Sequence, residues 1–185
     1  MWLFGAAGSG NSRETARRLL RYAVEEAWDI RELPRIAVEQ RGKPWFPDHP
    51  DCHFNLSHSG SYVFCGLADV PIGVDIEETV PRKDALAHYI MDLAELAAYC
   101  EHPDQDEMVY TLWTLKESYV KCTGEGISYP PQAAMKASVF DIGSGQAVKS
   151  NREGFSFKSF SGKGWRAAVC IQGEKEIPHI QWVLS

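Results

Sequence analysis

The chain has 185 residues, of which 44% are hydrophobic and 11% aromatic, so it is long enough to bury a substantial core. Its formal net charge of -6 and the lack of a polybasic run argue against nucleic acid as a partner, because phosphate binders usually carry a basic excess. The five cysteines are widely spaced and contain no C-x-x-C pair, which is typical of a reducing compartment. No run approaches the ~18 apolar residues of a membrane span, and the first ten residues do not resemble a signal peptide. We therefore expect a cytoplasmic protein without a membrane partner.

The first part of the chain predicts one helix followed by strands. After a short apolar run and a Gly- and Ser-rich loop, residues 12–28 form a helical pattern with Ser12 as N-cap. Prolines make residues 42–51 extended or turned. Strand-like runs then follow at residues 54–59, 62–68 and 72–77. Because turn residues separate them, these runs predict an antiparallel meander.

The second part of the chain repeats this order of helix and strand. Helical patterns cover residues 82–100 and 106–124, and the segment "GEGISYPP" ends the second one. Further strands are expected at residues 138–142, 155–160, 165–172 and 180–184. The order predicts an α+β fold of two similar lobes, residues 1–79 and 80–185, each a small antiparallel sheet packed on a long helix.

Asp75 and Glu77 in "GVDIE" are two residues apart on a predicted strand, so both carboxylates leave the same face. On an antiparallel sheet with one wet face, this spacing is also explained by simple solvation. Glu117 on the second predicted helix could add a third carboxylate. Three acidic oxygens without clustered cysteine or histidine suit a hard ion such as Mg²⁺, which commonly takes substrate phosphates as its other ligands.

The helix that contains "WTLKESYVKCTGEG" carries two lysines that need an explanation. Lys121 lies one turn after Glu117, and the two could form only a weak pair on the helix surface. Lys116 falls inside the apolar arc of the helix, where either its stem lies on apolar surface while the amine stays in water, or the side chain makes a contact that bridges the lobes.

Two other segments only partly match known binding motifs. The segment "GAAGSGNS" imitates a phosphate-binding loop, but Asn11 stands where the motif needs lysine, so the main partner of the phosphates is missing. A zinc site of His49, Cys52, His53 and His58 does not match the spacing of known ligand frameworks.

Four blocks occur in order along the chain: "GKPWFP", "FNLSHSG", "GVDIE" and "WTLKESYVKCTGEGIS". Together they resemble the motifs of the 4'-phosphopantetheinyl transferases, in particular the Sfp-like, two-lobed, monomeric class. The resemblance is close over residues 41–129, and "GWRAAVCIQ" is similar to a late strand of the family.

The resemblance implies a pseudo-twofold pair of α+β lobes with coenzyme A in the cleft between them and Mg²⁺ on its pyrophosphate. It also implies transfer of the phosphopantetheine arm to a serine of an apo acyl, peptidyl or aryl carrier protein. The products would be the holo-carrier protein and adenosine 3',5'-bisphosphate. A monomer is expected.

The resemblance assigns roles to individual residues. It makes Asp75, Glu77 and Glu117 the metal ligands, with Glu117 also a candidate general base for the incoming serine. Lys121 matches the lysine that neutralises the pyrophosphate and stabilises the charge growing on the leaving group.

The coenzyme A contacts implied by the resemblance are Lys43, Ser57 and His58, of which His58 would bind a phosphate best when protonated. Few residues of this sequence precede the segment that resembles the family's first basic helix, so we expect the family's basic clamp for the 3'-phosphate to be partly missing. Arg18 falls at a contact position, and we expect this arginine to replace the missing lysines, because a guanidinium binds phosphate with two parallel hydrogen bonds.

Two points stay open at the level of sequence. Only Glu95 remains of a Phe-Ser-x-x-Glu element, and residues 80–100 are expected to shape the surface that meets the carrier protein. A protein that binds coenzyme A or a carrier protein without turnover is one alternative function. A Mg²⁺-dependent phosphohydrolase of coenzyme A is another, and it would need no acceptor protein.

Overall fold

The structure, a computed structural model, describes residues 1–8, 12–81, 85–125, 135–142 and 148–184. Its helices are α1 (Ser12–Trp28), α2 (Ala85–Ile90), α3 (Leu93–Glu101) and α4 (Gln105–Thr123). Its strands are β1 (Trp2–Ala7), β2 (Ala37–Val38), β3 (Pro44–Trp45), β4 (His53–Ser59), β5 (Tyr62–Ala68), β6 (Ile72–Glu78), β7 (Phe140–Ile142), β8 (Val148–Ser150), β9 (Phe155–Gly162), β10 (Trp165–Gln172) and β11 (Gln181–Leu184). Within these ranges, no helix is both long enough and apolar enough to cross a bilayer.

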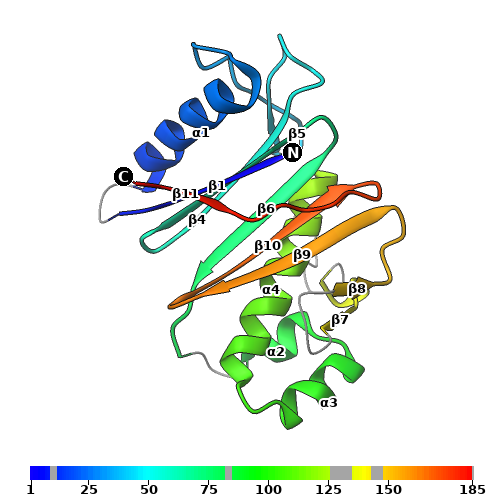
Figure 1. The fold of residues 1–185 in the computed structure, drawn as a ribbon. Helices are drawn as coiled ribbons and strands as arrows, with labels where there is room; N and C mark the ends of the chain where they lie inside the picture. Colours follow the sequence, from blue (N-terminus) through cyan, green and yellow to red (C-terminus); the bar gives the residue numbers. More distant parts are fainter. Residues whose placement is uncertain (9–11, 82–84, 126–134, 143–147, 185) are drawn as a thin grey trace.

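Two sheets form the body of the molecule (Figure 1). The first has the strand order β11-β1-β5-β4, and the second has the order β6-β10-β9. All pairings within them are antiparallel except that of β1 with β11, which is parallel. The predicted α+β class, with small and mainly antiparallel sheets that each pack on a long helix, is therefore confirmed.

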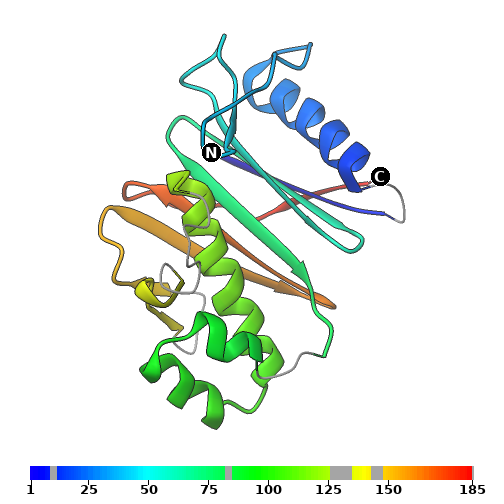
Figure 2. The same cartoon turned by 180° about the vertical axis from the view of Figure 1, so that it is seen from behind.

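The sheets pack against each other and carry one long helix on each outer side. Alternate residues of β5 and β6, such as Phe64 and Val74, share a buried cluster with Val169 of β10 between the sheets. The outer face of the first sheet packs on α1, and the outer face of the second sheet packs on α4. Figure 2 shows α2 and α3 beside the N-terminal half of α4, away from α1.

The meander predicted for residues 54–77 is wrong in its third strand. β4 and β5 form an antiparallel hairpin, but β6 pairs with β10 and begins the second sheet. In exchange, β11 from the end of the chain joins β1. A cut between residues 79 and 80 therefore does not separate the two sheets, because each sheet takes one strand from the other part of the chain. Local patterns identify strands but not their long-range partners.

The single helix predicted over residues 82–100 is also wrong, because the helix is interrupted between α2 and α3. Asp92 has an extended backbone, its side chain accepts from the N–H of Glu95 (2.8 Å), and Glu95 accepts from the N–H of Asp92 (3.1 Å). This reciprocal capping box starts a new helix at Leu93. Residues 82–84 lie outside the described residues, as does most of the segment predicted to follow α4.

A close approach between α4 and β6 depends on Gly73. A Cβ atom at this position would lie 2.1 Å from the carbonyl oxygen of Ser118 and 2.3 Å from the backbone nitrogen of Cys122. Such contacts are far too short for any side chain, so glycine is required here. The helix can therefore lie directly on the strand that carries Asp75.

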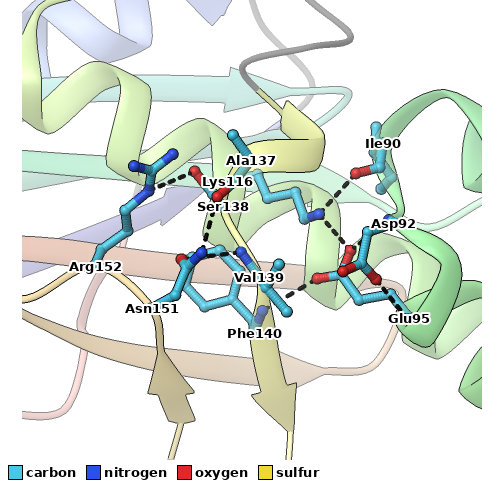
Figure 3. A network of polar contacts seen from close by, with 10 residues as sticks. All are labelled: Ile90, Asp92, Glu95, Lys116, Ala137, Ser138, Val139, Phe140, Asn151 and Arg152. Carbon is cyan, nitrogen blue, oxygen red and sulfur yellow. Dashed lines mark hydrogen bonds and ion pairs between the residues drawn. The ribbon is translucent and has the colours of Figure 1, made fainter.

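The buried lysine of α4 is held by an ion pair in the second lobe (Figure 3). Lys116 is 0% exposed, and its Nζ donates to Glu95 Oε2 (2.6 Å) and to the carbonyl oxygen of Ile90 (2.7 Å). The other oxygen of Glu95 accepts from the N–H of Phe140 on β7 (3.1 Å). One carboxylate thus joins α3, α4 and β7, and Lys116 does not reach water as a snorkelling side chain would.

We expect Glu95→Gln to lower the free energy of unfolding by about 3 to 5 kcal/mol, because it leaves the Lys116 ammonium buried without its anion. Adding Lys116→Met should recover roughly half of that loss, since the two sites are directly coupled. Urea denaturation of both variants measures this. Asp48→Asn is the control, because it removes the exposed pair with Arg35 (3.6 Å) and should change stability by less than about 1 kcal/mol. Equal losses in the single and double variants would contradict this account.

Candidate active site

Two carboxylates of β6 are held by serines of β4, across the boundary between the sheets. Ser57 Oγ donates to Asp75 Oδ1 (2.7 Å), and Ser59 Oγ donates to Glu77 Oε2 (2.6 Å). Both pairs follow the two-residue period of a strand, so Asp75 and Glu77 leave the same face of β6, as predicted. This face lies under α4, because Gly73 on the same face touches that helix.

Lys121 in the last turn of α4 reaches the same point. Its Nζ lies 2.6 Å from Asp75 Oδ1 and donates to Ser57 Oγ (3.1 Å). Among the described residues, no ion pair joins Lys121 to Glu117, so the weak pair on the helix surface is not formed. Lysine, serine and aspartate instead form one compact hydrogen-bonded group.

Glu117 lies one turn earlier on α4, and the structure leaves part of it without a partner. The residue is 8% exposed, and Glu117 Oε1 and Asp75 Oδ2 are both buried without a hydrogen-bond partner. Burial, followed by the negative charge of Asp75, raises the pKa of Glu117 to about 7. Burial also raises the pKa of Asp75, although Lys121 and Ser57 oppose this shift. Two unsatisfied acidic oxygens in one place are costly unless a cation or donor binds them.

A cavity of about 300 Å³ opens beside this group, and Lys43, Glu117 and Lys121 line it. Lys43 donates from Nζ to the carbonyl oxygen of Cys122 at the end of α4, and burial lowers its pKa. The helix ends at Gly124, whose φ of 69° is left-handed. A Cβ atom there would lie 3.1 Å from the Lys43 side chain, so this glycine both ends the helix and makes room for the lysine.

The structure does not place Arg18 or His58 in this cavity. His58 follows Ser57 in β4, so its side chain leaves the opposite face of the strand, and it is exposed. Arg18 is exposed on α1 and lines a separate hollow of about 530 Å³ with Arg17 and Arg21. Their assignment to coenzyme A stays a prediction.

Comparison with known proteins decides the family. The model of the 4'-phosphopantetheinyl transferase superfamily matches residues 71–170, which include β6, α4 and most of β10. The chain belongs to the 4'-phosphopantetheinyl transferase superfamily.

Named relatives agree with this assignment. A 4'-phosphopantetheinyl transferase of Bacillus subtilis is 35% identical over 143 residues, which cover 68% of this chain and 64% of that protein. The transferase Sfp of Bacillus subtilis strain 168 is 40% identical over 98 residues (52% and 44%), and AcpT of Escherichia coli K12 is 41% identical over 97 residues (50% of each). The matches therefore span about half to two thirds of the length of these curated relatives. A holo-[acyl-carrier-protein] synthase structure of Thermotoga maritima aligns with a TM-score of 0.48 and 16% identity, over 57% of this chain and 64% of that one.

The site of this superfamily member includes two residues that the sequence analysis missed. Trp113 Nε1 donates to Glu77 Oε1 (3.1 Å), and Ser59 Oγ holds the other oxygen of the same carboxylate. Trp113 is given no role in the sequence analysis. Its place four residues before Glu117 could have indicated a role at the site, because residues one turn apart share a helix face. Ser59 could have been found from its two-residue spacing to Ser57.

The donor set at this site fits a hard cation, although no metal centre is formed in the side-chain positions observed. In the part of the chain that the structure describes, no group of three His, Cys, Asp or Glu side chains could hold a metal ion as it stands. Lys121 occupies one oxygen of Asp75, and Glu77 is bonded to Ser59 and Trp113. The unpartnered oxygens of Asp75 and Glu117 are nevertheless the ligand type that Mg²⁺ prefers.

We expect Glu117→Gln to stabilise the metal-free protein at pH 8 but not at pH 4. The folded pKa of about 7 lies above the ordinary 4.5, so the stability of the protonated form is present below pH 4.5 and is lost as pH rises through 7. The gain at pH 8 should reach at most about 3 kcal/mol. Urea unfolding in EDTA across this range measures it. Glu125→Gln, which changes an exposed carboxyl just after α4, is the control. Parallel curves for Glu117→Gln and the wild type would refute the shift.

Proposed function

We propose that this chain transfers the 4'-phosphopantetheine arm of coenzyme A to a serine of an apo acyl or peptidyl carrier protein. Family membership and the names of its relatives support this proposal. The observation that carries it is the buried group of Asp75, Glu117 and Lys121, where acidic oxygens without a partner lie beside a lysine and a cavity. Such a group suits a divalent cation bound to a pyrophosphate. A monomeric state and a cytoplasmic location stay predictions from the sequence.

Asp75, Glu77 and Glu117 would hold Mg²⁺ in this proposal. The ion would neutralise the pyrophosphate of coenzyme A and stabilise the charge that develops on the leaving bisphosphate. The chain already orients two of these ligands, since Ser57 and Ser59 of β4 donate to the carboxylates of Asp75 and Glu77. Such supporting contacts orient ligands before a metal binds.

The lysines and Glu117 would act on the substrates directly. Lys121 would exchange its contact with Asp75 for one with the pyrophosphate, because the metal would then neutralise that carboxylate. Lys43 lines the same cavity and would contact coenzyme A from the other side. Glu117 would accept the proton of the attacking serine as a general base. Ser57 and His58 complete the proposed contacts with coenzyme A.

The test is incubation of the purified chain with coenzyme A, Mg²⁺ and candidate apo-carrier proteins, followed by intact-mass analysis. The expected result is a carrier protein heavier by one phosphopantetheine group, with no product in EDTA. A protein that only binds would give no mass change with any carrier. A phosphohydrolase would consume coenzyme A without an acceptor. Either of these results would overturn the proposal.

We expect Asp75→Asn and Glu117→Gln each to lower kcat/KM for transfer by at least roughly 100-fold, because each removes the negative charge of a proposed metal ligand. Asp69→Asn is the matched control. It removes an exposed carboxylate before β6 that pairs only loosely with Lys175 (3.7 Å), and its rate should stay at the wild-type value. Circular dichroism checks that the variants are folded. Wild-type turnover in both site variants would refute the assignment.

We expect Arg18→Ala to raise the KM for coenzyme A roughly tenfold, since a charge-assisted contact with the 3'-phosphate would be lost. The variant should also no longer distinguish coenzyme A from 3'-dephospho-coenzyme A. Arg31→Ala, which removes an exposed arginine beyond the end of α1, is the control and should leave both values unchanged. An unchanged preference in Arg18→Ala would exclude this arginine from the contact.

A further inference from the structure

Two buried thiols, those of Cys122 on α4 and Cys170 on β10, lie in contact between the helix and the second sheet. The residues are 1% and 0% exposed and belong to one small apolar cluster with Tyr119. All five cysteines of the chain are free thiols in this structure. The two thiols of this pair therefore lie close together, and both are reduced.

The close approach at Gly73 brings the two backbones together. Gly73 pairs with Cys170 in the register of β6 and β10, and a Cβ atom on Gly73 would lie 2.8 Å from Cys122 Cα. The last turn of α4 thus lies over the strand pair, with Cys122 beside Cys170. A disulfide needs two cysteines on neighbouring segments of backbone, and the packing of α4 on β6 and β10 at Gly73 makes these segments neighbours.

Cys122 is the member of the pair that borders a cavity. It lines a cavity of about 480 Å³ that is separate from the one between Glu117 and Lys121, and Lys43 lines both cavities. The hydrogen bond from Cys170 lowers the pKa of the Cys122 thiol, and the nearby Lys43 ammonium acts in the same direction, although burial opposes them. Burial raises the pKa of Cys170. Because Cys122 and not Cys170 lines this cavity, Cys122 is the thiol of the pair that an oxidant reaches first.

We propose that Cys122 and Cys170 are an oxidation site, at which a peroxide converts the two thiols into a disulfide between α4 and β10. The Cys122 thiolate attacks one oxygen of hydrogen peroxide, the O–O bond breaks, and hydroxide leaves, which gives a sulfenic acid. The Cys170 sulfur then attacks the Cys122 sulfur, the S–O bond breaks, and water leaves. In total, two thiols and one hydrogen peroxide give one disulfide and two waters.

The disulfide would fix the end of α4 in place. Cys122 follows Lys121 directly, and its carbonyl oxygen holds the ammonium of Lys43. A covalent bond to β10 would restrain the turn that positions both lysines, and it would also restrict the unfolded chain. Neither effect depends on the transferase function.

The test uses the purified full chain, reduced and then treated with hydrogen peroxide. After denaturation and alkylation, we expect the number of free thiols to fall from five to three, because one disulfide removes two. Trypsin should release the peptides 122–136 and 167–175 joined by a disulfide, while Cys52 and Cys65 stay together in a different peptide. The midpoint of thermal unfolding should rise on oxidation and return when dithiothreitol is added.

Two variants control this experiment. Cys65→Ala removes a buried thiol of the first lobe and should still give the cross-link, whereas Cys170→Ala should give none. A cross-link from Cys122 to Cys52, which lines the same cavity, would overturn the proposal. Sulfinic acid on Cys122 without any cross-link in the wild type would also overturn it. Both outcomes are read from the wild-type protein, so they do not depend on the folding of a variant.

Discussion

The structure depends on the burial of α4, which lies between the second sheet, α2 and α3, and forces each charge on its buried faces to find a partner. Lys116 meets Glu95, and this pair fixes α3 and β7 on the helix. Lys121, in the last turn of the helix, binds Asp75 on the side that faces the first sheet. Glu117 lies between them and keeps an oxygen without a partner. The unmet charge distinguishes the candidate site, because a buried polar group without a partner calls for an explanation such as a bound ion or ligand.

Contact between the sheets gives this site its geometry. Asn55 of β4 accepts the N–H of Val74 through its side chain (2.9 Å), and the two serines that follow at two-residue spacing hold the carboxylates of β6. Hydrogen bonds from a strand of the first sheet thus orient acidic groups on a strand of the second. Gly73 lets α4 lie against the same strand, so Asp75 lies within reach of both β4 and the helix. A shift of either sheet would separate the serines from the carboxylates.

Much of this could be predicted from the sequence, because it depends on local patterns. The helix predicted at residues 12–28 agrees with α1, and the one predicted at 106–124 differs from α4 by one residue at each end. The pairing of β6 with β10 and of β1 with β11 could not be predicted, since it depends on which sheets pack together. Glu95 is the clearest example. The sequence shows an acidic residue 21 positions before Lys116, but only the fold shows that Asp92 turns the chain so that the two side chains meet.

The two lysines of α4 show how similar contacts can have different consequences. Glu95 binds Lys116 and two backbone N–H groups, so both of its carboxylate oxygens have partners. This pair therefore stabilises the fold and offers no oxygen to a ligand. Asp75 binds Lys121 and Ser57 through one oxygen and leaves the other free. A cation at the free oxygen would weaken the hold of Asp75 on Lys121, because the carboxylate charge would be shared. Lys121 would then be free to turn toward the cavity and neutralise a bound anion. Binding of the cation to the folded state alone would also stabilise the fold, by offsetting the repulsion between Asp75 and Glu117.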